Sequence, residues 1–220
     1  MKTTIIITAG GIGKRMGADI PKQFLPLRNR PILMHAIECF YQYDEHLQVL
    51  VTLPSDWWEF WQELCRKHEF TIPHVLIKGG IERYDSIKNA LSRATGDIIG
   101  VHDGVRPLVS STTLRNCFKL AHQKGSAVPV LPLKESLRKG TLIESAAQKR
   151  SEFFAVQTPQ CFQREILLKA YQLPFSDEIT DDASLVEKAG FPIFLTLGNE
   201  ENIKVTTPLD LKIGEVLMEN

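Results

Sequence analysis

The chain has 220 residues, of which 43% are hydrophobic and 24% charged, so its composition is that of an ordinary globular protein long enough to bury a core. Lys and Arg together number 26, as do Asp and Glu, and the formal net charge is zero. This balance argues against a nucleic-acid or membrane partner, and any anionic ligand must be held by a local cluster of positive charge.

Strand-like and helix-like segments alternate along most of the chain. Residues 3–8 form a β-branched run typical of a strand, and residues 31–43 are predicted to be a helix with Pro31 at its first position. Alternation of this kind predicts an α/β fold in three layers, with helices on both faces of a mostly parallel sheet. The further predicted elements are a strand at 49–53, a helix at 56–68, a strand at 74–77, a helix at 84–94, strands at 97–102, 127–131, 153–156 and 193–197, and helices at 112–124, 164–171, 183–189 and 209–218.

The stretch from Leu133 to Arg150 interrupts this alternation. It is polar and carries Gly140 near its centre, which predicts an exposed hairpin outside the buried sheet. We therefore expect one domain over residues 1–220, with a protruding arm at 133–152. Because the arm is too polar to fold by itself, it is expected to interlock with a second copy of the chain, and a homodimer is the simplest closed arrangement.

The sequence predicts a cytoplasmic protein. Residues 1–7 are too short for a signal peptide, and no apolar run is long enough to span a bilayer. The four cysteines, Cys39, Cys65, Cys117 and Cys161, lie far apart and form no Cys-x-x-Cys pair. This spacing indicates reduced thiols rather than a disulfide framework or a zinc site.

A glycine-rich loop at residues 8–17 follows the first predicted strand. Ligands of parallel sheets bind beyond the carboxyl ends of the strands, and glycines there let backbone N–H groups approach phosphate oxygens closely. The spacing excludes a dinucleotide-binding loop, because Gly11-x-Gly13 is followed by Met16 where a third glycine would stand. It also excludes a P-loop, because Arg15 follows the Gly-Lys pair in place of Ser or Thr.

Six segments in a fixed order extend this site over almost the whole chain. They are the loop with Pro21-Lys22-Gln23-Phe24-Leu25, then Gly79-Gly80-Ile81-Glu82-Arg83-Tyr84-Asp85-Ser86, His102-Asp103-Gly104-Val105-Arg106-Pro107, Gln157-Thr158-Pro159-Gln160, Thr180-Asp181-Asp182-Ala183-Ser184 and Asn202-Ile203-Lys204-Val205-Thr206. Together they resemble the sugar-nucleotide pyrophosphorylase-like nucleotidyltransferases and, among these, the 2-C-methyl-D-erythritol 4-phosphate cytidylyltransferase family.

The resemblance implies a Rossmann-like nucleotidyltransferase domain. Its reaction would transfer a cytidylyl group from CTP to 2-C-methyl-D-erythritol 4-phosphate, giving 4-diphosphocytidyl-2-C-methyl-D-erythritol and pyrophosphate in non-mevalonate isoprenoid precursor biosynthesis. The ribitol 5-phosphate cytidylyltransferases remain an alternative, since they share the loop and the segments that begin at Gly79 and His102. The segment from Thr180 to Ser184 resembles the erythritol-phosphate family more.

The resemblance also implies a role for residues in each segment. Attack of a substrate phosphate oxygen on the α-phosphorus of CTP needs positioning and positive charge more than a covalent nucleophile. Arg15 and Lys22 match catalytic positions that hold the triphosphate, and Asp103 matches the catalytic position that binds Mg²⁺. The positions implied for the nucleotide are Ala9, Gly10, Gly11, Gly13, Gly79, Gly80, Arg83 and Ser86, and those implied for the sugar-alcohol phosphate are Arg106, Ser136, Arg150, Thr158, Thr180 and Lys204.

The resemblance gives Mg²⁺ a single carboxylate, that of Asp103. One carboxylate can suffice for Mg²⁺, since the ion keeps phosphate oxygens and waters in its shell. His102, beside Asp103, is more typical of a packed and hydrogen-bonded histidine than of a catalyst. Arg150 matches an arm residue that reaches the substrate phosphate of the neighbouring subunit.

The sequence departs from the family pattern at Ile81, where an Asp often stands, and at Ser136, where Thr is common. If backbone groups recognise the cytosine, Ile81 changes little; if the side chain at this position does, base selectivity is affected.

Two other classes of protein remain as alternatives. The glycine spacing argues against a nicotinamide-dependent oxidoreductase, and the presence of Arg15, Lys22 and Asp103 argues against a catalytically silent nucleotide-binding regulator.

Overall fold

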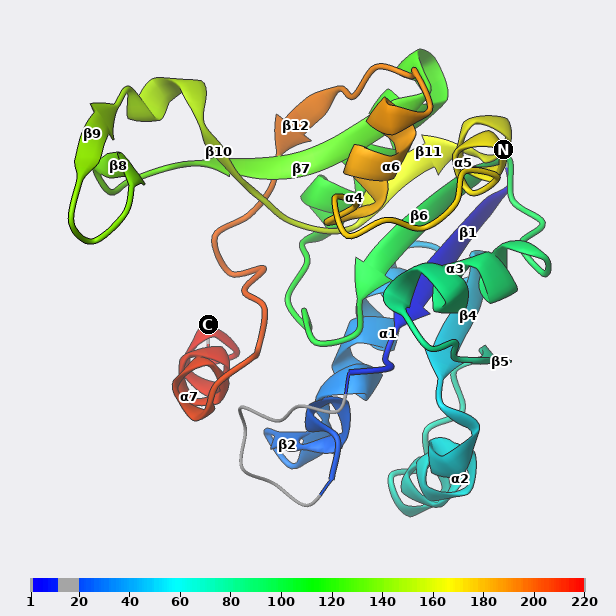
Figure 1. Ribbon diagram of the computed structural model, residues 1–220. Coiled ribbons are helices and arrows are strands. Elements are labelled where there is room, and N and C mark those ends of the chain that lie inside the picture. The colour runs from blue at the N-terminus through cyan, green and yellow to red at the C-terminus, as the bar shows by residue number, and fades with distance from the viewer. Residues whose placement is uncertain (1, 12–19, 220) are drawn as a thin grey trace.

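The computed structural model describes residues 2–11 and 20–219, and its centre is a twisted sheet (Figure 1). Within these ranges the sheet has eight strands. Their order is β10 (Phe154–Val156), β7 (Ser126–Pro132), β11 (Gln160–Gln163), β6 (Ile98–Asp103), β1 (Thr3–Thr8), β4 (Gln48–Leu53) and β5 (Val75–Lys78), with β12 (Leu195–Leu197) paired to β7. Of these strands, β10 and β11 run antiparallel to their neighbours, so the predicted mostly parallel sheet is confirmed.

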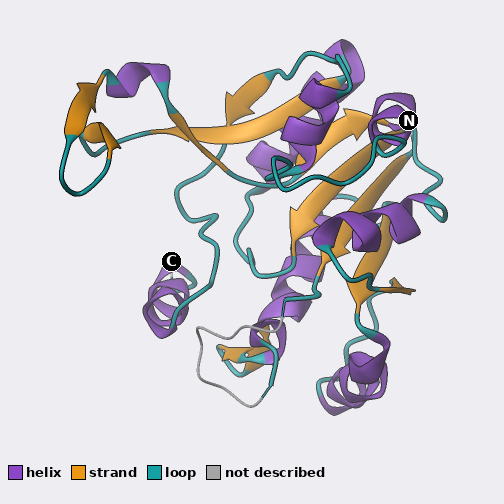
Figure 2. Cartoon of the chain, in the orientation of Figure 1, coloured by secondary structure: helices purple, strands orange, loops and turns teal. Residues whose placement is uncertain are grey.

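Helices cover both faces of the sheet, as predicted (Figure 2). Side chains of α1 (Ile32–Tyr43), α2 (Trp58–Lys67) and α4 (Ser111–Lys124) join one core cluster, and those of α3 (Arg83–Leu91), α5 (Arg164–Ala170) and α6 (Asp182–Lys188) join the other. Strand β1 shows why both faces of the sheet are buried. Ile5 and Ile7 pack in the first cluster and Ile6 in the second, because successive strand residues point to opposite faces.

The order in which strands are added creates a switch point. The chain runs from β1 through α1 to β4 and through α2 to β5, and then α3 returns it to β6 on the other side of β1. The connections after β1 and β6 therefore leave in opposite directions, and a crevice opens at the carboxyl ends of these two strands. Doubly wound sheets bind their ligands at such a point.

Each predicted helix and strand has a counterpart, but the short strand β11 was not predicted. It places Gln160, Cys161 and Phe162, all buried, between β6 and β7. Gln160 interrupts the apolar pattern that would predict a buried strand, because a glutamine is rarely buried. Its side chain is satisfied here by Asp181, to which Nε2 donates at 2.7 Å, and by the backbone N–H of Ala183, which Oε1 accepts at 2.8 Å.

The predicted exposed hairpin is confirmed. Strands β8 (Leu137–Gly140) and β9 (Ser145–Gln148) pair antiparallel as a separate sheet, which projects from the body of the molecule (Figures 1 and 2). Gly140 has a φ of 144°, and a Cβ there would lie 2.3 Å from the carbonyl oxygen of Glu144, so the turn requires glycine. Within the described ranges, no helix is long and apolar enough to cross a membrane.

The last helix, α7 (Pro208–Leu217), packs apart from the two large clusters. Leu211 and Met218 lie against a small cluster that includes Leu27, on β2 (Pro26–Leu27). Strand β2 pairs with β3 (Arg30–Pro31) in a two-stranded sheet that was not predicted. These short elements carry the chain from the glycine-rich loop into α1.

Candidate active site

The carboxyl ends of β1, β4, β5 and β6 border a cavity of about 260 Å³. It lies at the switch point and draws residues from four of the six matched segments, which are far apart in the sequence. The lining residues are Thr8, Ala9, Gly10, Gly11, Lys22, Gln23, Thr52, Pro54, Gly79, Gly80, Ile81, Glu82, Arg83, Ser86, Asp103, Val105 and Lys204.

The described part of the glycine-rich loop is fixed at its start. The backbone N–H of Ala9 donates to the carbonyl of Thr52 at 2.9 Å, and the buried Gln23 side chain donates to the carbonyl of Ala9. A Cβ at Gly10 would have no heavy atom within 4 Å, and one at Gly11 would meet Cε of Lys22 at 3.8 Å. Gly10 and Gly11 therefore present open backbone to the cavity, with Lys22 beside Gly11.

Two predicted site residues, Gly13 and Arg15, lie outside the described residues. Lys22 follows them on a short 3-10 helix over Lys22–Phe24, and the next two side chains of that helix are buried. Phe24 packs against Trp57, Phe60 and Trp61 at ring-centroid distances of 5.8, 5.3 and 6.0 Å. Trp57 and Trp61 thus have a packing role, and they anchor the segment that carries Lys22.

Gly79, Gly80 and Ser86 form the opposite wall. The backbone N–H of Gly80 donates to Oγ of Ser86 at 2.9 Å, and that hydroxyl donates to the carbonyl of Glu82 at 3.1 Å. A Cβ at Gly80 would lie 2.2 Å from Cβ of Asp85, so the turn closes only with glycine. The side chain of Ile81, by contrast, is 95% exposed at the rim.

Gly80→Ala is expected to lower the free energy of unfolding by about 1–3 kcal/mol, the usual cost of overpacking, because its Cβ overlaps Asp85. Gly10→Ala is the matched control, since its Cβ meets nothing, and it should unfold like the wild type in urea. Equal urea midpoints for the two variants would contradict the tight turn at Gly80.

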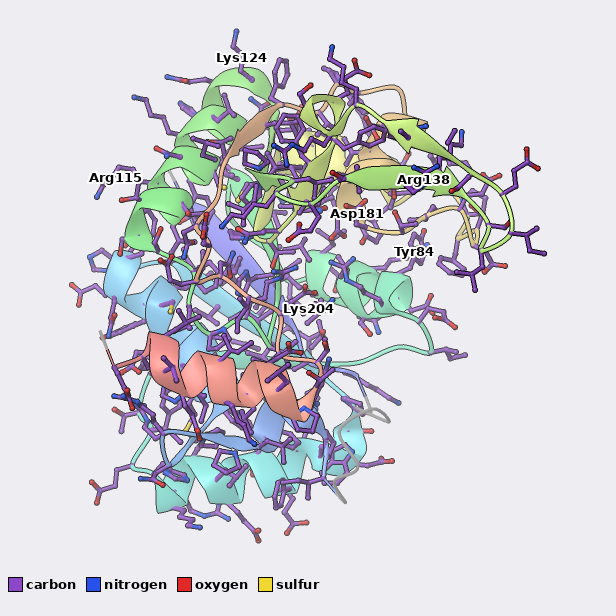
Figure 3. All side chains as sticks on the ribbon, turned by 90° about the vertical axis from the view of Figure 1, so that its left-hand side faces the viewer. Tyr84, Arg115, Lys124, Arg138, Asp181 and Lys204 are labelled. Atoms are coloured by element: carbon purple, nitrogen blue, oxygen red, sulfur yellow. The ribbon has the colours of Figure 1, made fainter. Side chains whose placement is uncertain are left out.

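Asp103 ends β6 and is the electrostatic centre of the cavity. Its Oδ2 accepts from Nε of Arg106 and pairs with Nζ of Lys204, each at 3.1 Å. Burial raises the pKa of this carboxyl, but the cations Lys204, Arg106 and Arg83 outweigh that effect and hold the pKa well below its usual range. Asp103 is therefore ionised at neutral pH. Lys204, the predicted substrate ligand that pairs with it, lies near the centre of Figure 3, between α3 and α7.

His102 is fully buried, and burial lowers its pKa to about 4. Its Nε2 lies 2.9 Å from the carbonyl of Arg106, and its Nδ1 lies 2.9 Å from Oγ1 of Thr158. The prediction of a packed and hydrogen-bonded histidine is confirmed. Thr158 is itself buried behind Asp103, whose backbone N–H donates to Oγ1 at 3.1 Å.

The segment that carries Lys204 is tied across the end of β6. Nη1 of Arg106 donates to the carbonyl of Asn202 at 2.8 Å, and the backbone N–H of Val205 donates to the carbonyl of Val105 at 2.9 Å. Arg106 does not line the cavity, because its guanidinium is held between Asp103 and Asn202. It therefore stands behind the carboxylate and holds it in place.

Arg83 and Thr180 border a smaller neighbouring cavity of about 140 Å³. Arg83 lines both cavities and forms an ion pair with Asp182, whose side chain is fully buried and also accepts from the Tyr171 hydroxyl at 2.6 Å. The backbone N–H of Thr180 donates to Oγ of Ser184 at 3.1 Å. Thr180 thus lies next to the main cavity without lining it.

Ser136 and Arg150 are exposed on the arm and line neither of these cavities. Arg150 donates to the carbonyl of Lys134, at the base of the arm. Figure 1 shows the arm projecting away from the ends of β1 and β6, which border the cavity. The chain's own arm therefore does not complete the chain's own cavity.

The donor chemistry around Asp103 fits a magnesium ion that is completed by phosphate. Both ion pairs of Asp103 fall on Oδ2, and among the described residues no hydrogen bond or ion pair involves Oδ1. No cluster of three or more His, Cys, Asp or Glu that could hold a metal occurs in the described ranges. One ionised carboxylate suits Mg²⁺, which usually binds through one or two carboxylates and substrate phosphates.

Sequence reasoning gave no role to Gln23 and Thr52, although both line the cavity. Thr52 lies near the carboxyl end of β4, so the rule that placed the site at strand ends could have included it. Its buried hydroxyl has no hydrogen-bond partner among the described residues. Gln23 lies in a matched segment, but only the fold shows that it fixes Ala9.

The chain resembles one family throughout its length. A family model described as 2-C-methyl-D-erythritol 4-phosphate cytidylyltransferase matches residues 3–220. A protein of that name from Bacteroides thetaiotaomicron is 48% identical over 220 residues, covering 99% of this chain and 100% of the relative. One from Porphyromonas gingivalis is 45% identical over 219 residues, covering 99% of this chain and 98% of the relative.

Solved structures agree with this resemblance. The crystal structure of the enzyme of that name from Thermus thermophilus is 29% identical, covers 100% of both chains and gives a TM-score of 0.78. That from Francisella tularensis is 26% identical, covers 98% of this chain and 99% of its own, and gives a TM-score of 0.81.

Proposed function

The chain belongs to the 2-C-methyl-D-erythritol 4-phosphate cytidylyltransferase family, and we propose that its reaction takes place in the cavity between the ends of β1 and β6. It is a nucleotidyltransferase of non-mevalonate isoprenoid precursor biosynthesis. It transfers a cytidylyl group from CTP to 2-C-methyl-D-erythritol 4-phosphate and releases pyrophosphate.

One observation carries the assignment of the site. A single cavity is lined by the open backbone of Gly10 and Gly11, by Lys22, by the wall from Gly79 to Ser86, and by the ionised Asp103 with Lys204. These groups supply what the reaction needs, which is a phosphate loop, cations, a close-fitting wall and a carboxylate.

The nucleotide would lie between the loop and the opposite wall. Backbone N–H groups of Gly10 and Gly11 would bind the triphosphate, while that of Ala9 stays on the carbonyl of Thr52, and Lys22 and Arg15 would offset the charge that develops on the α-phosphate oxygens. The cytosine would lie against Gly79 and Gly80, where the absence of side chains lets backbone groups and Ser86 read the edge of the base.

Asp103 would hold Mg²⁺ through its carboxylate. When bound, the ion supplies positive charge next to the phosphate oxygens and lowers their repulsion toward the incoming phosphate. The protein's own part is to keep the carboxylate ionised and oriented, through Arg106 and Lys204.

The sugar-alcohol phosphate would approach from the side of Lys204. The side chain of Lys204 is half-exposed, and its ammonium group forms an ion pair with Asp103. Because Lys204 lines the cavity, it can turn toward an incoming phosphate without leaving it. Arg106, Thr158 and Thr180 would complete this side, directly or by holding their neighbours.

The arm is proposed to complete the site of a partner subunit. Ser136 and Arg150 lie away from the cavity of their own chain, and the arm carries exposed apolar side chains, Leu142 and Ile143, at its turn. A homodimer in which each arm crosses to the other copy would bring an arginine to each phosphate site and cover these side chains. We also propose a cytoplasmic location, which the four free cysteines favour.

A structure of the protein with CTP and Mg²⁺ tests this placement. We expect the triphosphate along residues 9–11, the cytosine against Gly79 and Gly80, and the metal within bonding distance of Asp103. A nucleotide bound in the smaller cavity next to Thr180, or a metal held without Asp103, would contradict the assignment.

A further inference from the structure

A buried chain of hydrogen bonds links His102 to both ends of the loop that carries Asp103. The carbonyl of Arg106 can only accept, so Nε2 of His102 carries the proton of that 2.9 Å bond. In the neutral imidazole Nδ1 then has no proton and accepts from the Thr158 hydroxyl at 2.9 Å. The hydroxyl oxygen in turn accepts the backbone N–H of Asp103 at 3.1 Å. Each hydrogen bond in this series therefore has one defined donor and one defined acceptor.

This series of hydrogen bonds fixes the turn from Asp103 to Arg106. The backbone N–H of Arg106 donates to the carbonyl of Asp103 at 3.0 Å, and its side chain donates from Nε to the Asp103 carboxylate. The imidazole therefore holds one end of the turn directly and the other end through Thr158. His102 is fully buried and its ring packs edge-on against Phe40 at 4.9 Å, so it acts only through its neighbours.

We propose that His102 is a positioning residue of the cytidylyl-transfer site, which, together with the Thr158 hydroxyl, holds the Asp103 carboxylate where Lys204 and the substrate phosphates meet. This inference rests on the proposed function of the cavity. It gives Thr158 a role through Asp103 rather than a direct contact with the sugar-alcohol phosphate. Groups that orient a metal-binding carboxylate typically contribute 10-fold to 100-fold to activity.

A double-mutant cycle separates the two roles of Thr158. His102→Phe removes both bonds and keeps a ring against Phe40, and Thr158→Val removes only the hydroxyl. If the two residues act as one unit, each single variant lowers kcat about 10-fold to 100-fold, and the double variant is no slower than the slower single variant. The KM values for CTP and for the sugar-alcohol phosphate should change little.

Conservative variants serve as controls. Thr158→Ser keeps the hydroxyl, and His102→Asn keeps an acceptor near the Nδ1 position, so both should recover a larger kcat than Thr158→Val and His102→Phe. If His102→Phe does not fold, as judged by thermal unfolding, His102→Gln takes its place in the cycle, because it retains a donor for the Arg106 carbonyl and lacks the Nδ1 acceptor.

The outcomes that overturn the proposal are distinct. Multiplying losses in the double variant would show that the residues act independently. A raised KM for the sugar-alcohol phosphate in Thr158→Val, with kcat unchanged and His102→Phe like the wild type, would make Thr158 a direct ligand. A wild-type protein without cytidylyl transfer would overturn the proposed function as well, whereas active wild type with unaffected variants would overturn only this inference.

Discussion

Lys22→Ala is expected to lower kcat for cytidylyl transfer about 100-fold to 1,000-fold and to leave the fold intact. A preorganised charge that faces the transition state contributes about 3–4 kcal/mol in sites of this kind. The segment that holds Lys22 is preorganised, since Gln23 is tied to Ala9 and Phe24 is packed among tryptophans. Steady-state kinetics with CTP varied at saturating acceptor measures the effect.

Lys119→Ala is the matched control for this substitution. Lys119 is exposed on α4, which packs in the core cluster on one face of the sheet, and it does not line the cavity. It should match the wild type in kcat and in thermal stability. If Lys22→Ala raised only the KM for CTP, Lys22 would serve ground-state binding, and its transition-state role would be wrong.

Mixing two inactive variants is expected to restore activity. If the arm crosses between subunits, each site takes Lys22 from one chain and Arg150 from the other. Lys22→Ala and Arg150→Ala homodimers should then both be nearly inactive, because each of their sites has one defect. In a mixed dimer one site carries both defects and the other carries neither, so refolding the two variants together should give about a quarter of wild-type activity when about half of the dimers are mixed.

Size-exclusion chromatography of the refolded sample provides the control, since it shows that dimers have formed. Each variant refolded alone should remain nearly inactive. A refolded mixture that is dimeric and as inactive as its parents would show that Arg150 acts within its own chain. An Arg150→Ala homodimer as active as the wild type would show that Arg150 has no catalytic role.

The sequence was informative where a local pattern reflects burial or a strand end. The alternation of strand-like and helix-like segments predicted a sheet covered on both faces, and the run Ile5-Ile6-Ile7 contributes to both core clusters. Ligands were expected beyond the carboxyl ends of the parallel strands, and the cavity lies there, with Asp103 at the end of β6 beside β1.

The remaining features depend on contacts between segments that are distant in the chain. Nothing near Lys204 in the sequence shows that it pairs with Asp103, and nothing near Arg83 shows that it pairs with the buried Asp182. The strand at Gln160 was hidden because its polar side chain is satisfied by Asp181 and Ala183, which the fold brings to it. These pairings are set by tertiary packing, which a pattern of single residues does not encode.

Pyrophosphate release with CTP, UTP and ATP, each tested against 2-C-methyl-D-erythritol 4-phosphate and ribitol 5-phosphate in the presence and absence of Mg²⁺, tests the central claim most directly. We expect release only with CTP, Mg²⁺ and 2-C-methyl-D-erythritol 4-phosphate together. A preference for ribitol 5-phosphate, or equal rates with all three nucleotides, would contradict the account.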